Sequence, residues 1–345
     1  MKDKLFDFDD ILIQPTILSN ISSRKEINVR DENGMLPIFT APMDTVISEE
    51  NIHIFEKNGI MPVLPRVSVI DKNHYSTSMF YSYSMQDFEM IFLKNTIKIN
   101  ENEKVYALID VANGHMRLLY DLAKESKKKY GDSICLMIGN VANPKTFLSY
   151  CQIGVDIIRI GIGNGNGCLT TVQTGVGYPM ASLIKECADV KYGYNTKIVA
   201  DGGFKKYSDI IKAFALGADY IMLGSLLNKA LESAGETTNW NDGTVVDQYS
   251  DDVLAKFKAD TPFFKTFRGM STKEVQEKWG KESLTTSEGV VRTNKVEYTL
   301  DGWVKNLEDY LKSAMSYTGK KELHDFIGGV DFNFISHSSF KRFDK

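Results

Sequence analysis

The chain has 345 residues, of which 43% are hydrophobic and 25% are charged, a composition typical of soluble globular proteins. Its 41 lysine and arginine residues face 45 aspartate and glutamate residues, which gives a formal charge of -4. Nucleic acid is excluded as the main partner, because binding to its phosphates requires a basic excess. No stretch approaches the roughly 20 apolar residues of a membrane-spanning helix, and acidic residues interrupt the N-terminal segment where a signal peptide would need a continuous apolar run. We therefore expect a cytoplasmic protein with no membrane partner.

Short apolar runs recur between charged segments that have a helical pattern. Because these runs lack the alternation of half-exposed strands, they predict buried parallel strands. Seven are clear, and an eighth is expected between Met79 and Leu93, where the period is ambiguous. The seven lie at 36–41, 60–64, 105–111, 135–138, 156–160, 197–200 and 220–223, and helices are expected at 116–130, 144–153, 181–190 and 207–216. The repeat favours an α/β fold of the closed (β/α)8 type, a TIM barrel, over a doubly wound open sheet.

The composition of the sequence changes near residue 236. Residues 236–303 are polar and contain few runs that resemble strands, so we expect a long lid over one end of the barrel. Amphipathic helices at 303–317 and 320–327 would then close the chain. No linker interrupts the earlier part, and we expect residues 1–345 to form one barrel domain.

The segment IGIGNGNGCLTTVQTGVGYP, residues 160–179, carries the strongest chemical signal. Glycine at such density is tolerated mainly where the backbone takes unusual dihedral angles or approaches a ligand closely. Cys168 follows a predicted strand, which places it at the C-terminal mouth of the barrel, where barrel enzymes hold their reactive groups. Its thiolate could attack an electrophilic carbon, with Thr170 relaying protons. The alternative, an incidental cysteine in a surface loop, agrees less well with this position.

Two further strand ends have phosphate-binding character. IVADGG, residues 198–203, and IMLGSLL, residues 221–227, end the predicted strands seven and eight. Barrels commonly hold a phosphate at this place through backbone N–H groups. Asp201 cannot hold phosphate, but its carboxylate suits the diol of a sugar.

ALIDVANGH, residues 107–115, ends another predicted strand with Asp110 and Asn113. These side chains could contact a ligand, or they could cap the helix expected near Met116. The sequence supports both readings equally. The four cysteines form no CxxC pair, and the five histidines show no metal-binding spacing.

The order of the motifs resembles the IMP dehydrogenase and GMP reductase family over nearly the whole chain. The matching motifs are DFDDILIQP (7–15), APMDTV (41–46), DVANG (110–114), GNV (139–141), GIGNGNGC (161–168), TGVGYP (174–179), DGG (201–203), LGS (223–225), RGMS (268–271) and SEG (287–289). The resemblance implies a barrel that binds a purine nucleoside 5′-monophosphate, a cysteine that attacks C2 of the base, and a nicotinamide cofactor. It also implies a homotetramer.

The resemblance assigns roles to individual positions. Cys168, Thr170 and Glu288 match the catalytic residues, and the carbonyls of Gly163 and Gly165 with Cys168 match a monovalent cation site, such as one for K+. The matched cofactor positions are Ser23, Arg24, Asp110, Val111 and Ala112. The matched substrate positions are Asn166, Asp201, Gly202, Gly203, Gly224, Ser225, Arg268, Gly269, Met270, Ser271, Ser287 and Gly289.

Within this family the sequence favours the GMP reductase branch. The stretch between Arg66 and Val105 is too short for the paired CBS modules that most IMP dehydrogenases carry. The resemblance then implies NADPH-dependent reductive deamination of GMP to IMP and ammonia through a covalent cysteine thioimidate.

Three alternatives stay open. FRGMS at 267–271 leans toward an IMP dehydrogenase without CBS modules, using NAD and a base such as Arg292 or Tyr298. Asn166 and Thr171 stand where the family has serine and arginine, which would suit a paralogue acting on a modified purine nucleotide. The third alternative is a nucleotide-binding regulator without catalysis, which would have no need of the cysteine, threonine and glutamate together.

Overall fold

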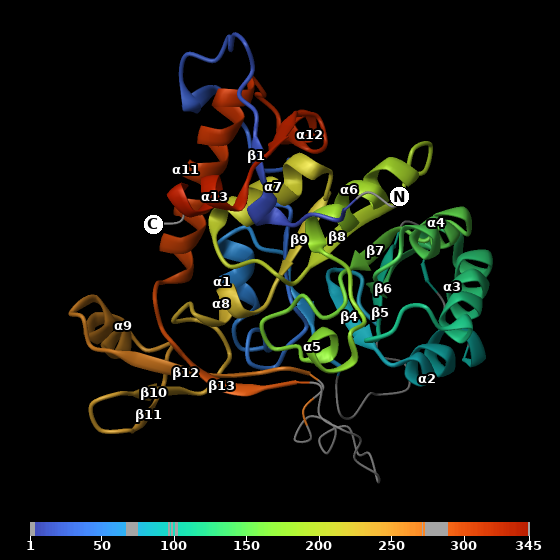
Figure 1. Cartoon of the computed structure of the whole chain (residues 1–345). Coiled ribbons are helices and arrows are strands. Elements are labelled where there is room, and N and C mark those ends of the chain that lie inside the picture. The colour runs from blue at the N-terminus through green and yellow to red at the C-terminus, as the bar shows by residue number, and fades with distance from the viewer. Residues whose placement is uncertain are drawn as a thin grey trace.

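The structure, a computed structural model, describes residues 4–66, 75–95, 97, 99–100, 103–270, 272 and 289–343. Its centre is an eight-stranded parallel sheet in which each strand from the second onward pairs with the next along the chain (Figure 1). The last strand pairs with the first, and Phe39 in the first strand bridges to Met61 just before the second, which closes the ring. The predicted (β/α)8 barrel is therefore confirmed. Its strands are β2 (Ile38–Thr40), β3 (Val63–Leu64), β4 (Phe80–Tyr83), β5 (Val105–Asp110), β6 (Ile134–Val141), β7 (Ile157–Ile160), β8 (Lys197–Asp201) and β9 (Tyr220–Leu223).

The ambiguous stretch between Met79 and Leu93 contains a strand and helical turns. β4 is followed by α2 (Met85–Phe88) and the π-helical segment η3 (Glu89–Lys94). Phe88 and Phe92 stack at 4.6 Å between ring centroids, one helical turn apart. Aromatic residues at both spacings explain why the sequence shows no single period there.

The helices around the barrel follow from apolar spacing and from their caps. In α3 (Arg117–Tyr130), the buried residues Leu119, Leu122, Ala123 and Ser126 recur at the spacing of one helix face. The other principal helices are α1 (Ile52–Lys57), α4 (Pro144–Gln152), α6 (Met180–Val190), α7 (Tyr207–Leu216), α8 (Ser225–Asn228), α11 (Leu300–Thr318), α12 (Leu323–Phe326) and α13 (His337–Phe343). α11 begins three residues earlier than expected because the Thr299 side chain accepts a hydrogen bond from the Gly302 amide and caps it.

The interior of the barrel is apolar along most of its length and charged at the C-terminal mouth. A buried cluster takes side chains from every strand, among them Phe39, Val63, Phe80, Leu108, Met137, Ile157, Val199 and Met222. Successive strand residues alternate between faces, so a residue two positions later points into the same interior. Asp110, Arg159 and Asp201 therefore lie inside the barrel at its C-terminal mouth.

Residues 236–303 contain more regular structure than the sequence suggests. β10 (Thr237–Asn239), β11 (Val245–Val246), β12 (Phe263–Arg268) and β13 (Val291–Lys295) form an antiparallel sheet in the order β11-β10-β12-β13, which we call the flap sheet. α9 (Asp251–Lys258) packs its buried Val253 against Phe263 and Val296. The expectation of few strands was wrong, because no apolar run marks these strands: β12 alternates buried with half-exposed positions, and β13 is mostly exposed.

The two ends of the chain pair with each other on the outside of the barrel, beside α7. β1 (Ile11–Ile13) pairs antiparallel with β14 (Phe332–Phe334). Among the described residues, no helix has the length and apolar character needed to cross a membrane.

Candidate active site

The segment between β7 and α5 (Thr170–Thr174) forms a tight loop, residues 161–169, which we call the cysteine loop. Gly161 has a φ of 122° and Gly163 a φ of 77°, both in the region that favours glycine. A Cβ on Gly161 would lie 2.5 Å from the Asp201 carbonyl oxygen, and one on Gly163 would lie 1.7 Å from Thr171 Oγ1. The glycines therefore let the loop fold against β8 and α5 over the barrel mouth.

Cys168 lies half-buried in this loop. Its Sγ donates to Thr170 Oγ1 at 3.2 Å, and its amide donates to the Gly165 carbonyl at 2.9 Å. The other three cysteines are buried, and burial raises the pKa of the Cys135 thiol to about 12. Thiolates rather than thiols are nucleophiles, so Cys168 is the best-placed of the four cysteines for chemistry.

The two glycine-ended strands expected to hold phosphate meet the cysteine loop. Asn166 Nδ2 donates to Ser225 Oγ at 3.1 Å, across the mouth between the ends of β7 and β9. Gly202 has a φ of 92°, and a Cβ there would lie 2.9 Å from the Gly165 amide nitrogen. Gly203 and Gly224 belong to the same two strand ends. The structure thus gathers the whole predicted phosphate group of residues.

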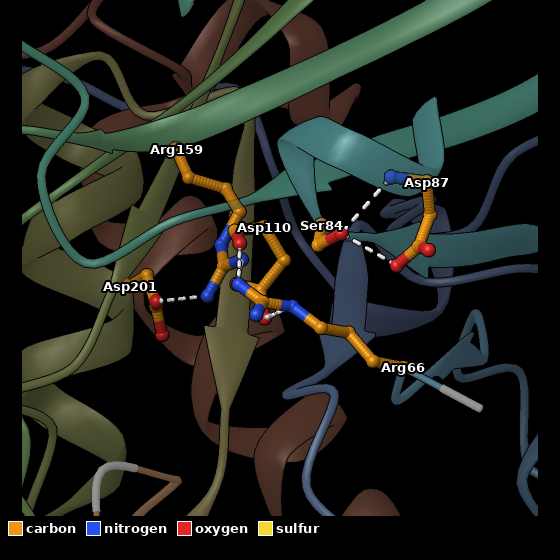
Figure 2. Close-up of polar contacts among 6 residues, drawn as sticks. All are labelled: Arg66, Ser84, Asp87, Asp110, Arg159 and Asp201. Atoms are coloured by element: carbon orange, nitrogen blue, oxygen red, sulfur yellow. Dashed lines mark hydrogen bonds and ion pairs between the residues drawn. The ribbon is translucent and has the colours of Figure 1, made fainter. Parts of the chain in front are cut away.

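A charged cluster occupies the top of the barrel interior (Figure 2). Arg159 Nη1 donates to Asp110 Oδ1 at 2.7 Å, and Arg159 Nη2 donates to Asp201 Oδ2 at 2.8 Å. Asn140 Nδ2 donates to the same Asp201 oxygen at 2.8 Å. On the other side, Arg66 donates to the Asp110 carbonyl, and its Nε lies 3.5 Å from Asp110 Oδ2. Arg159 therefore links Asp110, expected at the cofactor, to Asp201, expected at the substrate.

Neither Arg159 nor Arg66 was predicted from the sequence as a site residue. The Arg159 side chain is only 7% exposed. Burial opposes its charge, but Asp201 and Asp110 outweigh that effect and raise its pKa. A signal was present, because Arg159 is the one charged residue in the apolar run IIRI, and a buried arginine needs partners.

The structure separates the two readings of the segment after β5. Met116 occupies the N-cap of α3 without a side-chain cap, Asp110 pairs with the arginines, and Asn113 Oδ1 accepts from the His115 amide at 3.0 Å. The helix-capping reading is therefore wrong for both Asp110 and Asn113.

The expected cofactor residues fall into two groups. Asp110, Val111 and Ala112 lie at the mouth, where β5 ends. Ser23 caps η2 (Arg24–Glu26), and Glu26 pairs with Lys321 at 2.8 Å beyond the end of α11. Figure 1 shows this blue N-terminal loop beside α11 and α12, at the opposite end from the flap sheet. A single chain therefore does not bring Ser23 and Arg24 near Asp110.

The flap sheet reaches the cysteine loop with the end of β12 and the start of β13. The Val290 amide donates to the Gly167 carbonyl at 3.1 Å, the Gly269 amide donates to the Val290 carbonyl at 2.9 Å, and Gly289 bridges to Cys168. A Cβ on Gly269 would lie 2.5 Å from the Gly167 carbonyl oxygen. The predicted purine-side residues Gly269 and Gly289 therefore lie directly beside the cysteine loop.

Two arginines fix this part of the flap sheet. Arg268 forms an ion pair with Asp44 of the segment after β2, with Nε to Oδ1 at 3.3 Å. Arg292 donates to the Asn166 carbonyl and lies over the Phe267 ring, 5.3 Å from its centroid. Met270 follows Gly269 in this segment, whereas the expected residues Ser271, Ser287 and Glu288 lie outside the described residues.

The fold and the site define a class: a (β/α)8-barrel enzyme with a cysteine loop and glycine-ended strands at its C-terminal mouth. Residues 93–343 match the family model described as the IMP dehydrogenase / GMP reductase domain. The chain belongs to this family, and like the enzymes of that family it is an oxidoreductase. The resemblance expected from the motifs is confirmed.

Relatives with assigned names cover nearly the full chain. GMP reductase 2 of Bos taurus is 29% identical over 354 residues, covering 93% of this chain and 92% of its own. GMP reductase of Phytophthora infestans is 28% identical, covering 96% and 90%. GMP reductase of Buchnera aphidicola subsp. Schizaphis graminum is also 28% identical, covering 97% and 95%.

Proposed function

We propose that this chain catalyses the NADPH-dependent reductive deamination of GMP to IMP and ammonia. The observation that carries the proposal is Cys168 beside Thr170 in a glycine-shaped loop, between a phosphate cradle and the flap sheet. All three relatives described above are named as GMP reductases, which agrees with this activity.

The chemistry begins with addition of the Cys168 thiolate to C2 of the purine, which forms a carbon–sulfur bond. Thr170 and Glu288 carry protons to the amino group on C2, the carbon–nitrogen bond breaks, and ammonia leaves a thioimidate. NADPH, when bound, supplies the hydride that C2 needs. The carbon–sulfur bond then breaks, the thiolate is restored, and IMP is released.

Substrate binding uses the rest of the mouth. The 5′-phosphate lies against Asn166, Gly202, Gly203, Gly224 and Ser225, where backbone amides and short polar side chains suit an anion. Asp201 accepts from the ribose hydroxyls through Oδ1, which has no hydrogen-bond partner among the described residues. The purine lies beside Gly269 and Gly289, next to the cysteine loop, and the flap sheet serves as its lid within one barrel domain.

Cofactor binding requires a second copy of the chain. Asp110, Val111 and Ala112 of one copy lie at a mouth, whereas Ser23 and Arg24 lie at the far end of the same copy. The two groups can hold one cofactor only if a neighbouring copy brings its Ser23 loop to this mouth. This argues for a homo-oligomer, and the family resemblance implies a tetramer.

A potassium ion would suit the cysteine loop. Carbonyl oxygens such as those of Gly163 and Gly165 are suitable ligands for K+. The Gly165 carbonyl already accepts from the Cys168 amide, which leaves one lone pair for a cation. Bound K+ would fix the backbone that presents Cys168, so replacing potassium by tetramethylammonium should lower kcat.

The test uses purified chain with GMP and NADPH, and follows cofactor absorbance and ammonia release together. Glu288→Gln should slow turnover by about 100- to 10,000-fold, the range for losing a general acid or base. The matched control is Glu297→Gln, since Glu297 pairs with Lys229 at 2.8 Å and has no part in the mechanism. Turnover of GMP that is equally fast in Glu288→Gln would refute the proton step.

The runner-up activity is oxidation of IMP with NAD. It requires a base in the lid segment 236–303, but Arg292 donates to the Asn166 carbonyl and Tyr298 OH donates to the Leu226 carbonyl at 2.6 Å. Both side chains already donate hydrogen bonds to backbone carbonyls within the fold, so neither is placed to act as the base. This favours the reductase. IMP oxidation without ammonia release from GMP would reverse this choice.

The modified-purine alternative rests on Asn166, which donates to Ser225, and on Thr171. Its Oγ1 donates to the Val176 carbonyl at 2.7 Å, in a space that glycines at 163 and 177 leave open. Nucleotide binding without turnover of GMP or IMP would favour that paralogue or a non-catalytic regulator.

A further inference from the structure

The charged cluster at the mouth joins two binding functions through one side chain. Asp201 faces the proposed nucleotide, and Asp110 faces the proposed cofactor. Both carboxylates are 16% exposed, whereas Arg159 between them is 7% exposed. The guanidinium thus lies beneath both sites and is itself screened from both ligands.

We propose that Arg159 is a positioning residue that couples the binding of the purine nucleotide to the binding of the dinucleotide cofactor. The inference rests on the proposed function and deepens it. Its physical basis is that one guanidinium donates one hydrogen bond to each carboxylate. A change in position or charge at either aspartate therefore changes the hydrogen bond between Arg159 and the other aspartate.

The anchoring of Arg159 supports this coupling. Its Nη1 and Nη2 each hold one aspartate, but its buried Nε has no hydrogen-bond partner among the described residues. The guanidinium is therefore fixed mainly by the two carboxylates. When a ribose hydroxyl donates to Asp201, it fixes the position of this carboxylate and, through Arg159, also the position of Asp110.

The two ends of the cluster are held by other groups. Asn140 Nδ2 donates to Asp201 and also to the Gly161 carbonyl, at 2.8 Å each, which ties Asp201 to the cysteine loop. Arg66 contacts Asp110 from the segment after β3. The first ligand to bind orders this chain of contacts. The second ligand then binds with a smaller loss of conformational entropy. We therefore expect positive coupling.

The experiment is equilibrium titration calorimetry of GMP, with and without saturating NADP+, a pair that cannot transfer hydride. In the wild type, NADP+ should tighten GMP binding by about 5- to 150-fold, the usual range of coupling between sites. By reciprocity, GMP should tighten NADP+ binding by the same factor. Arg159→Lys should reduce this factor to below about 2, because one ammonium cannot reproduce the planar fork that reaches both aspartates.

Arg66→Lys is the matched control. Arg66 contacts Asp110, whereas the ion pair to Asp201 comes from Arg159. This variant should change the NADP+ affinity and keep the coupling factor. Direct contact between the two ligands is present in every variant, so it cannot produce a difference between Arg159→Lys and Arg66→Lys.

Asp110→Asn provides a second test if Arg159→Lys does not fold. Asp110 does not face the nucleotide, yet its replacement should change GMP affinity at least about fivefold without cofactor, the lower end of site coupling. Binding of both ligands with wild-type coupling in Arg159→Lys, or unchanged GMP affinity in Asp110→Asn, would overturn the inference and leave the proposed function standing. Failure of the wild type to bind GMP and NADP+ would overturn both.

Discussion

Asn228 joins the flap sheet to the barrel, and its replacement tests how the flap is held. The side chain is fully buried, and its amide donates to the Thr45 carbonyl at 2.8 Å and to the Thr266 carbonyl at 3.1 Å. Its Oδ1 accepts from Asn294 at 2.8 Å. Three elements therefore meet at one amide: the segment after β2, strand β12 and strand β13.

Asn228→Leu keeps the volume of the side chain and removes all three hydrogen bonds. Each net bond contributes about 0.5–1.5 kcal/mol, and a buried partner left unpaired adds to the cost. We expect the free energy of unfolding to fall by about 3–5 kcal/mol. Asn294→Ala removes one of the three bonds and should cost about 1 kcal/mol. Asn241→Ala, at an exposed position, should change stability by less than about 0.5 kcal/mol.

Urea unfolding measures the total, and hydrogen exchange locates the effect. In Asn228→Leu, amides of β12 and β13 should lose protection before those of β6 and β7, because the variant releases the flap sheet from the barrel. The KM for GMP should rise with it, since the purine-side segment follows β12. A loss below about 1 kcal/mol, or equal loss of protection in barrel and flap, would refute the view that Asn228 holds the flap.

The remaining predictions concern the nucleophile, the phosphate and pH. Cys168→Ala should abolish turnover while GMP binding stays measurable by calorimetry, and Cys151→Ala is its control; residual activity in Cys168→Ala would refute the covalent step. Guanosine should bind at least about 100-fold more weakly than GMP, because the phosphate cradle would lose its anion, and equal affinities would rule out that cradle. Lys265 is fully buried, and burial lowers its pKa to about 7. The unfolded chain then binds a proton that the folded chain releases between about pH 7 and 10.5, so stability should rise with pH in this window. The slope of unfolding free energy against pH should be smaller in Lys265→Met, and an unchanged slope would contradict the lowered pKa.

The sequence by itself determined the barrel and the position of the cysteine. Parallel strands buried on both faces require continuous apolar runs, and such runs are local features that are visible in the sequence alone. Glycine density likewise marked the loop at 161–169, because its cause, a backbone folded into tight contact, acts within a few residues. The motif order then identified the family.

Only the tertiary structure decided which charges meet. Asp110 and Arg159 are 49 residues apart in the chain, and Arg159 and Asp201 are 42 apart. No local pattern encodes such pairs, because their distance depends on how the strands close into a ring. The same holds for Ser23 and Arg24, which motif matching grouped with Asp110 and which the fold places at the opposite end. The flap sheet was hidden for a related reason: its strands are stabilised by pairing across long separations and by anchors such as Asn228, and neither leaves a period in the sequence.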